Sequence, residues 1–207
     1  MTLPPYIALE GAEGSGKSTQ AALLAESLGA VLTQETGGTA IGRRLRQILH
    51  DNDVVELDAR AEALIAAADR AQHFAEVVHP ALRAGRTVVS DRSVYSTLAY
   101  QGYGRQLDLA ELRRFNDWAL QGVWPSLVVF IEADPDVVAD RLNGRQLDRF
   151  ERAGESFHER VLEGYRRLAA ADPQRWIVVL SDGAKAEVAA RVLDAVRQRL
   201  GADGRRD

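Results

Sequence analysis

Cysteine is absent from this chain of 207 residues, which excludes disulfide bonds and metal sites built from thiolates. Long apolar runs are also missing, so no stretch approaches the length that spans a bilayer. Residues 1–6 show no basic segment followed by an apolar one, as a secretory signal would. We therefore expect a cytoplasmic protein, because the lack of cysteine also fits a reducing compartment.

Neither sign of charge dominates the composition. The 26 lysine and arginine residues against 30 aspartate and glutamate residues give a net charge of −4, so we expect neither nucleic acid nor membrane as a partner. Hydrophobic residues at 46% and charged residues at 27% are ordinary for a globular protein. The length suits a single domain over residues 1–207, with a polar, disordered tail at 201–207.

Short apolar runs rich in β-branched residues alternate with helical patterns along the chain. We interpret five of these runs as strands, at residues 6–9, 30–33, 87–90, 127–131 and 176–180. Near-continuous apolar runs are typical of strands that are buried on both faces. The pattern therefore predicts an α/β, three-layer fold with a parallel sheet and right-handed crossovers.

The clearest helical pattern covers residues 59–79. Apolar residues at spacings of three and four form one stripe, made of Ala61, Leu64, Ala68, Ala71, Ala75, Val78 and Leu82. We favour packing of this stripe on the sheet of the same chain over a seam between two subunits. The tryptophans are likewise expected in the core or between helices, at Trp118, Trp124 and Trp176.

Residues 11–18 read Gly-Ala-Glu-Gly-Ser-Gly-Lys-Ser and match the phosphate-binding pattern G-x-x-x-x-G-K-[ST]. Glycines let backbone N–H groups turn towards phosphates, and the N-terminus of the following helix adds a favourable dipole. Lys17 is expected to reach the β- and γ-phosphates, and the Ser18 hydroxyl to ligate Mg²⁺. A chance glycine-rich turn is the alternative, but the strand before it and the helix after it favour an ATP site. That site comprises Gly11, Ala12, Glu13, Gly14, Ser15, Gly16, Lys17, Ser18 and Thr19.

The third predicted strand is followed by Asp91 and Arg92. A carboxylate at this end of a neighbouring strand can hold Mg²⁺ directly or through water, and an arginine offers a planar fork for phosphate oxygens. A surface ion pair is the alternative interpretation. The chain has no Asn/Thr-Lys-x-Asp segment of the kind that reads guanine, which argues against a GTPase switch.

Together these segments resemble the bacterial thymidylate kinases, which are P-loop nucleoside monophosphate kinases. Besides the P-loop, the likeness is carried by residues 35–39 with Arg46, by residues 67–73 and by residues 91–102. It extends over nearly all of the chain. The resemblance implies a P-loop NTPase fold, transfer of the γ-phosphoryl group of ATP to dTMP, Mg²⁺ as cofactor and a homodimer.

The resemblance also implies an acceptor site. Arg92 matches the arginine that grips the 5′-phosphate of the acceptor, and Arg46 matches a second basic residue near it. Arg70 and Gln101 match residues that hydrogen-bond thymine, while Tyr100 matches the aromatic that crowds C2′ and favours deoxyribose. With Glu13 near the sugar and Thr97 facing the base, the implied set is Glu13, Glu35, Arg46, Arg70, Arg92, Thr97, Tyr100 and Gln101.

Residues 142–154 resemble the lid of the same family. Members whose P-loop lacks a basic residue supply a catalytic arginine from the lid, and residues 12–15 are here Ala, Glu, Gly and Ser. Arg145 and Arg149 are therefore candidates for catalysis alongside Lys17 and Arg92. A solvated run of charges is the alternative interpretation of the lid arginines.

Ala66 departs from the family pattern, because the family usually has a phenylalanine there that stacks on thymine. Loss of such a stack costs about 1–3 kcal/mol unless another ring replaces it. The candidates for that ring are Phe74, Tyr95 and Tyr103. This departure keeps open a kinase for another or a modified pyrimidine deoxynucleotide, with a nucleotide-binding switch or ATPase as a distant alternative.

Overall fold

The computed structural model describes residues 3–134, 137–138, 144 and 147–203. Its centre is a parallel sheet of five strands in the order β2-β3-β1-β4-β5. The strands are β1 (Tyr6–Glu10), β2 (Val31–Gln34), β3 (Val88–Asp91), β4 (Leu127–Glu132) and β5 (Trp176–Leu180). These bounds confirm the predicted α/β fold and place every predicted strand within one residue at each end.

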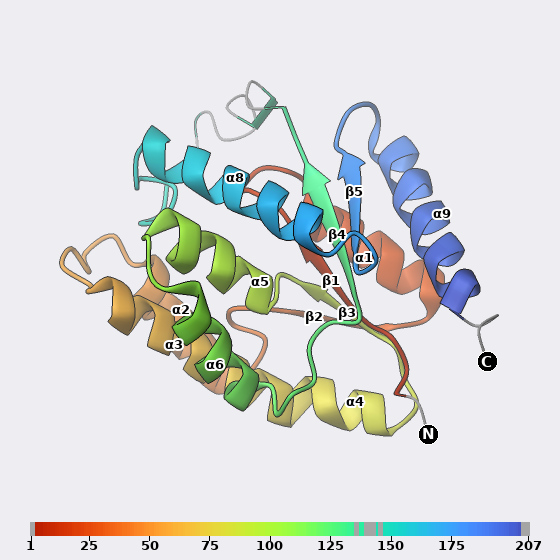
Figure 1. Cartoon of the computed structure of the whole chain (residues 1–207), viewed down its shortest axis with the longest axis horizontal. Helices are drawn as coiled ribbons and strands as arrows, with labels where there is room; N and C mark the ends of the chain where they lie inside the picture. Colours follow the sequence, from red (N-terminus) through yellow and green to blue (C-terminus); the bar gives the residue numbers. More distant parts are fainter. Residues whose placement is uncertain (1–2, 135–136, 139–143, 145–146, 204–207) are drawn as a thin grey trace.

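Helices cover both faces of the sheet, as Figure 1 shows. On one face lie α1 (Lys17–Leu28) and α9 (Lys185–Asp203). On the other side lie α2 (Ala40–His50), α3 (Ala59–His73), the π-helical turn η1 (Phe74–Val78), α4 (His79–Arg83), α5 (Val94–Thr97), the π-helical turn η2 (Leu98–Gly104), α6 (Leu109–Ala119) and α8 (Glu155–Ala171). The predicted tail begins as helix, because α9 continues to Asp203, and residues 204–207 lie outside the described part of the chain.

Two buried apolar clusters fill the space between the sheet and its helices. Val128 and Phe130 of β4 point into one cluster, while Val129 and Ile131 point into the other. The three inner strands are buried on both faces, as predicted. The edge strands β2 and β5 instead carry exposed apolar residues, such as Leu32 and Val178, which are each 50% exposed.

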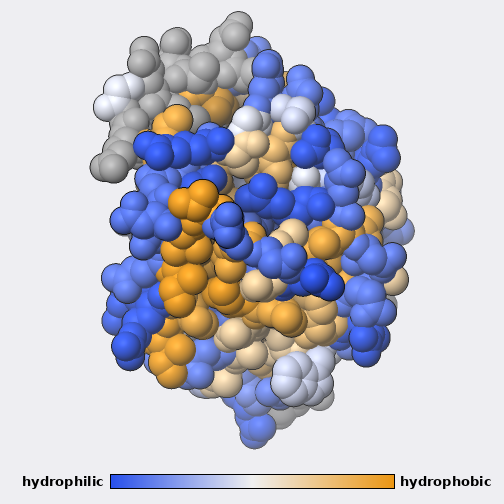
Figure 2. Space-filling view, turned by 90° about the vertical axis from the view of Figure 1, so that its left-hand side faces the viewer, coloured by the Kyte–Doolittle hydropathy of each residue, from blue (hydrophilic) through white to orange (hydrophobic). Residues whose placement is uncertain are grey.

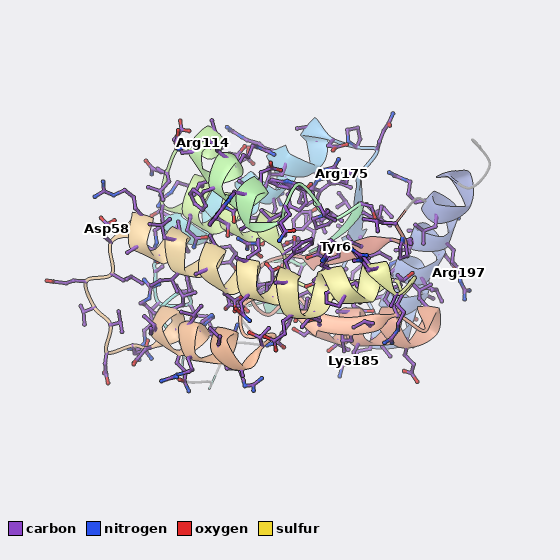
Figure 3. All side chains as sticks on the ribbon, turned by 90° about the horizontal axis from the view of Figure 1, so that it is seen from below. Tyr6, Asp58, Arg114, Arg175, Lys185 and Arg197 are labelled. Atoms are coloured by element: carbon purple, nitrogen blue, oxygen red, sulfur yellow. The ribbon has the colours of Figure 1, made fainter. Side chains whose placement is uncertain are left out.

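The helix predicted over residues 59–79 forms, but its inner face is not the predicted one. Figure 3 shows α3, η1 and α4 as one long ribbon that starts beside Asp58, whose side chain caps α3. Leu64 and Ala68 of the predicted stripe are exposed, whereas Glu62 and Arg70 are buried. The prediction was wrong for this half of the stripe because the inner face of α3 carries the polar side chains of the site.

Two further observations concern the surface. Trp176 is buried and Trp124 packs on Tyr95, but Trp118 is 82% exposed on α6, so the expectation of a packed Trp118 was wrong.

Among the described residues, no helix combines the length and the apolar character that crossing a membrane requires.

The pairing of β1 with β3 positions the functional segments. Leu9 of β1 is in register with Asp91 of β3, so the carboxyl ends of these parallel neighbours lie at the same edge of the sheet. The glycine-rich loop follows β1, and Arg92 follows β3. The two segments therefore begin side by side, at the edge where α/β sheets bind their ligands.

Candidate active site

The loop between β1 and α1 has a backbone that requires glycine. Gly11 has φ of +154°, and a Cβ there would lie 2.6 Å from the carbonyl oxygen of Ile131. Gly16, at φ of +93°, precedes α1 and has no side chain with which to cap the helix. The Ser181 hydroxyl donates to the carbonyl oxygen of Ser15 at 2.8 Å and fastens the loop to the end of β5. This arrangement leaves the N-terminus of α1 suited to an anion.

One carboxylate bridges the two cations that the sequence predicts at the phosphates. Glu13 Oε2 lies 3.4 Å from Lys17 Nζ, and Glu13 Oε1 accepts a hydrogen bond from Arg92 Nη2. Lys17 is only 5% exposed and also donates to the carbonyl oxygen of Ala12 at 3.3 Å. The Lys17–Glu13–Arg92 cluster therefore joins the glycine-rich loop to the end of β3.

The pKa values of this cluster follow from burial and charge. Burial disfavours the Glu13 carboxylate, but Arg92 and Lys17 outweigh that effect and hold its pKa far below the ordinary range. Burial and the neighbouring Arg92 lower the pKa of Lys17, and Glu13 only partly opposes them. The two cations are thus crowded together and depend on an anion between them.

Arg92 is held in an unusual conformation. Its φ of +70° lies in the left-handed region, which residues other than glycine rarely adopt. Its Nη1 donates to Ser96 Oγ at 3.0 Å and to the Tyr165 hydroxyl at 3.2 Å, and its guanidinium lies 5.0 Å from the centre of the Tyr100 ring. The buried carboxylate of Glu10 accepts hydrogen bonds from both Ser96 and Tyr165. The guanidinium therefore has a fixed direction.

The residues predicted to hold Mg²⁺ fit a hard cation. Asp91 Oδ1 is buried and has no hydrogen-bond partner within the described part of the chain, while Ser18 is exposed in the first turn of α1. A buried carboxylate oxygen needs a partner, and Mg²⁺ prefers oxygen ligands. The described residues contain no group of three or more His, Cys, Asp or Glu side chains able to hold a metal alone. A cation here would therefore complete its ligands with phosphate and water.

One cavity adjoins the cluster, and we call it the central cavity. All eight residues of the predicted acceptor set line it, namely Glu13, Glu35, Arg46, Arg70, Arg92, Thr97, Tyr100 and Gln101. They come from the glycine-rich loop, the segment after β2, α2, α3, the segment after β3, α5 and η2. The fold thus brings together side chains that are distant in the sequence.

Arg70 is almost fully buried at the end of the central cavity. Its Nε donates to Glu35 Oε2 at 2.9 Å, its Nη2 to the carbonyl oxygen of Ser93 at 3.2 Å, and its Nη1 to Asn116 Oδ1. The second Glu35 oxygen lies 3.0 Å from His73 Nδ1. Although burial opposes it, Arg70 and His73 lower the pKa of Glu35. Glu35 in this structure therefore holds Arg70 in place.

Sequence reasoning missed Phe150, an aromatic residue of the central cavity. Phe150 lines it together with Ala66 and meets the rings of Tyr100 and His50 at centroid distances of 5.8 and 5.2 Å. The rings suggested from the sequence, Phe74, Tyr95 and Tyr103, do not line the central cavity. Phe150 stands in the segment identified as a lid, where only the arginines drew attention. Its apolar character among charged neighbours was the available signal.

The structure describes only one of the two candidate lid arginines. Arg145 lies outside the described residues. Arg149 donates from Nη2 to Glu62 Oε2 at 2.7 Å and from Nε to the carbonyl oxygen of Leu49 at 2.9 Å. Its guanidinium is thus bound to α2 and α3. A catalytic role for either arginine stays a prediction.

Fold and site together define the class of protein. A glycine-rich loop after β1, with a buried lysine, faces an arginine-lined cavity at the same edge of the sheet. This is the arrangement of a P-loop phosphotransferase with separate places for a nucleotide and an acceptor.

Comparison with known proteins gives the family. The family model described as thymidylate kinase matches residues 9–192. The thymidylate kinase of Synechococcus sp. (strain JA-2-3B'a(2-13)) is 46% identical over 200 residues, covering 94% of this chain and 95% of that protein. The one from Halothermothrix orenii is 40% identical and covers 93% of this chain and 96% of that protein. The chain belongs to the thymidylate kinase family, as the sequence analysis predicted.

A solved structure supports the same assignment. The crystal structure of thymidylate kinase from Ehrlichia chaffeensis matches with a TM-score of 0.77 at 29% identity, covering 94% of this chain and all of that one (100%). The match extends the family assignment to the P-loop NTPase fold. The enzyme class is therefore a phosphotransferase that uses ATP as phosphoryl donor.

Proposed function

We propose that the protein transfers the γ-phosphoryl group of ATP to dTMP, giving ADP and dTDP for deoxynucleotide synthesis. The observation that carries this proposal is the shared position of Glu13 and Arg92, which line the central cavity and also belong to the cluster at the glycine-rich loop. Donor and acceptor phosphates can therefore meet between Lys17 and Arg92.

The chemistry needs positive charge and alignment more than a base. The attacking atom is an oxygen of the dTMP phosphate, whose second pKa lies near 6, so that it is largely deprotonated at neutral pH. Lys17 and the N–H groups of the loop hold the donor, and Arg92 holds the acceptor. An incoming phosphate takes the place of the Glu13 carboxylate between the two cations. Glu13 can then turn towards the sugar of the acceptor.

The other end of the central cavity suits the nucleoside. Arg70, Thr97 and Gln101 supply polar groups for the base, and Phe150 supplies an apolar wall. The ring of Tyr100 leaves no room beside the sugar, because Arg92 contacts both its hydroxyl and its ring and holds it in place. A fixed ring at C2′ favours deoxyribose over ribose.

We extend the proposal to the cofactor and the lid. Ser18 and Asp91 would hold Mg²⁺, which neutralises charge on the phosphate oxygens of ATP when it is bound. Arg145 and Arg149 are the two candidates for a catalytic lid arginine. For Arg149 this role requires release from Glu62, because the two are joined in the present arrangement.

We also propose a homodimer that works in the cytoplasm, where ATP and nucleoside monophosphates are available. Figure 2 shows a broad apolar area on the face that carries α2, α3 and α6. Exposed apolar side chains of these helices are Ile41 (51%), Ile48 (44%), Leu64 (57%) and Trp118 (82%). Large exposed apolar patches mark interaction sites more often than free surface. A second copy of the chain is the partner that the family assignment suggests.

An acceptor panel tests the proposed reaction. ADP formation from ATP is measured with dTMP, dUMP, dCMP and dGMP at matched concentrations, and without any acceptor. We expect the highest kcat/KM with dTMP and only background ADP without acceptor. Equal rates with all four nucleotides, or ADP release that needs no acceptor, would contradict the proposal.

A further inference from the structure

A buried carboxylate lies behind the base end of the central cavity and is not part of its lining. Glu62, on the inner face of α3, has 0% exposure. It accepts hydrogen bonds from Gln101 Nε2 at 2.8 Å, from Arg105 Nη2 at 3.2 Å and from Arg149 Nη2 at 2.7 Å. Of these donors, only Gln101 also lines the central cavity. Glu62 is therefore one contact away from a bound base.

This contact determines the orientation of the side-chain amide of Gln101. Paired with two arginines, Glu62 is a carboxylate, and a carboxylate only accepts hydrogen bonds. The amide group that faces Glu62 must then be the NH₂, as the 2.8 Å contact from Nε2 has it. With one N–H used in this way, the carbonyl oxygen and the other N–H of Gln101 form an acceptor–donor pair on one edge.

Such an edge distinguishes the pyrimidines. At N3 and C4, thymine and uracil offer a donor followed by an acceptor, whereas cytosine offers an acceptor followed by a donor. An amide held in one orientation matches only one of these orders, but an amide that can turn over matches both. Turning over would set the Gln101 carbonyl oxygen against the Glu62 carboxylate, which is a repulsive contact without a hydrogen bond.

We propose that Glu62 is a positioning residue that sets the base specificity of the enzyme. By holding the NH₂ of Gln101, Glu62 makes the central cavity select bases that have an N3–H donor beside a 4-carbonyl. Cytosine, which lacks both, is excluded. The inference rests on the proposed function, because it takes a thymidylate as the acceptor. It goes further by naming the residue that excludes dCMP.

The test compares two ratios of kcat/KM in the full-length Glu62→Gln variant. Glutamine has nearly the same size, but its amide can donate or accept, so Gln101 is free to take either orientation. We expect the ratio of dTMP to dCMP to fall about tenfold, which corresponds to about 1.4 kcal/mol. The ratio of dTMP to dUMP should stay within about twofold, because these bases share the same N3 and C4 edge. A folded variant with an unchanged ratio of dTMP to dCMP would overturn the proposal.

Two further variants separate positioning from general damage. Arg105→Gln removes another partner of Glu62 but leaves the contact with Gln101, so it should keep both ratios at the wild-type values. A fall in the ratio of dTMP to dCMP in this variant as large as in Glu62→Gln would count against the specific role of Glu62. Gln101→Met removes the amide edge itself and should lower the same ratio even if Glu62→Gln does not fold. A wild-type ratio in Gln101→Met would also overturn the proposal.

The wild-type enzyme shows which proposal has failed. If it does not prefer dTMP over dCMP, the proposed function is wrong and the inference about Glu62 falls with it. If the wild type prefers dTMP and Glu62→Gln retains the full preference, only the inference is wrong.

Discussion

Single residues of this site carry charges that are buried and paired, and Lys17 shows the consequence most clearly. Burial and the nearby Arg92 lower the pKa of Lys17, so its charged form is disfavoured in the folded chain. The same charge is needed at the β- and γ-phosphates. Function and stability therefore make opposite demands at this position.

Replacing Lys17 with methionine should separate these demands. We expect Lys17→Met to lower kcat with dTMP at least about 100-fold, because a buried positive charge at the phosphates is lost. Its Tm at neutral pH should equal or exceed that of the wild type, since the variant no longer buries a charge. Enzyme assays and thermal unfolding measure both. A variant that retains most of its activity would contradict the role of Lys17.

The pH dependence of this stability difference has a definite sign. Because the pKa of Lys17 is lowered by folding, the unfolded chain binds more protons there between that pKa and the ordinary value of about 10.4. The stability of the wild type therefore gains on that of Lys17→Met as pH rises through this window. Thermal unfolding of both proteins at neutral and alkaline pH measures the difference in Tm. A Tm of Lys17→Met that rises relative to that of the wild type as pH increases would contradict the assignment.

Phe150 makes a second prediction for a single residue. Its ring lines the central cavity, where Ala66 supplies no aromatic surface. We expect Phe150→Ala to raise KM for dTMP about tenfold, which lies within the range expected for the loss of one base–aromatic contact. KM for ATP should stay near the wild-type value. Adding Ala66→Phe to the same variant should recover part of the dTMP affinity, and an unchanged KM in Phe150→Ala would contradict the placement of the base.

At the scale of elements, the strands and the helix α3 follow from the sequence, but the inner face of α3 does not. Buried strands are apolar throughout, so their positions could be read from composition alone. The inner face of α3 carries the buried polar side chains of Glu62, Asp69, Arg70 and His73, while Leu64 faces outwards. Hydropathy spacing assumes that the apolar face points inwards. It therefore selected the wrong face where the element serves the site instead of the core.

Residues 147–154 form a segment that contacts a distant part of the chain. Asp148 Oδ2 lies 2.6 Å from His50 Nδ1, and Asp148 Oδ1 accepts from the backbone N–H groups of Phe150 and Glu151 at 2.9 Å. Burial opposes the Asp148 carboxylate, but the hydrogen bonds with His50 and with the backbone of Glu151 outweigh it and lower the pKa of Asp148. The contact between His50 and Asp148 joins residues that are 98 positions apart in the sequence, so no local pattern predicts it.

Asp148→Asn tests whether these bonds hold Phe150 at the central cavity. We expect faster amide hydrogen exchange in residues 147–154 and a higher KM for dTMP, because the negative acceptor is lost. In the wild type, protection should persist at neutral pH and decline only as pH falls below the ordinary Asp value of about 3.9. Asp108→Asn, which changes the cap of α6, should leave exchange in residues 147–154 unchanged. Equal exchange in all three proteins would contradict the prediction.

At the scale of the whole molecule, strand order explains why the site could be foreseen. Two segments that follow neighbouring parallel strands must meet at one edge, so the loop after β1 and the residues after β3 had to lie together. The roles along the central cavity came from resemblance, since spacing alone does not bring α2 and α3 to that edge. The contact of Glu62 with Gln101 came from neither source. It joins two buried polar groups that no single helix pattern pairs.

The apolar face of α2, α3 and α6 gives the prediction for assembly. We expect Leu64→Glu to convert the dimer to a monomer in sedimentation velocity, because it places a charge in the centre of the proposed interface. Val178→Glu is the matched control, since Val178 is 50% exposed but lies on the edge strand β5. Dimers in both variants, or a wild-type monomer at assay concentrations, would contradict the proposed homodimer.

The most direct test of the central claim is a crystal structure with dTMP and a non-hydrolysable ATP analogue bound together. We predict that the dTMP phosphate contacts the Arg92 guanidinium and that the terminal phosphate of the analogue contacts Lys17, with the Glu13 carboxylate displaced from between them. A dTMP phosphate bound elsewhere, with Glu13 still bridging Lys17 and Arg92, would contradict the account.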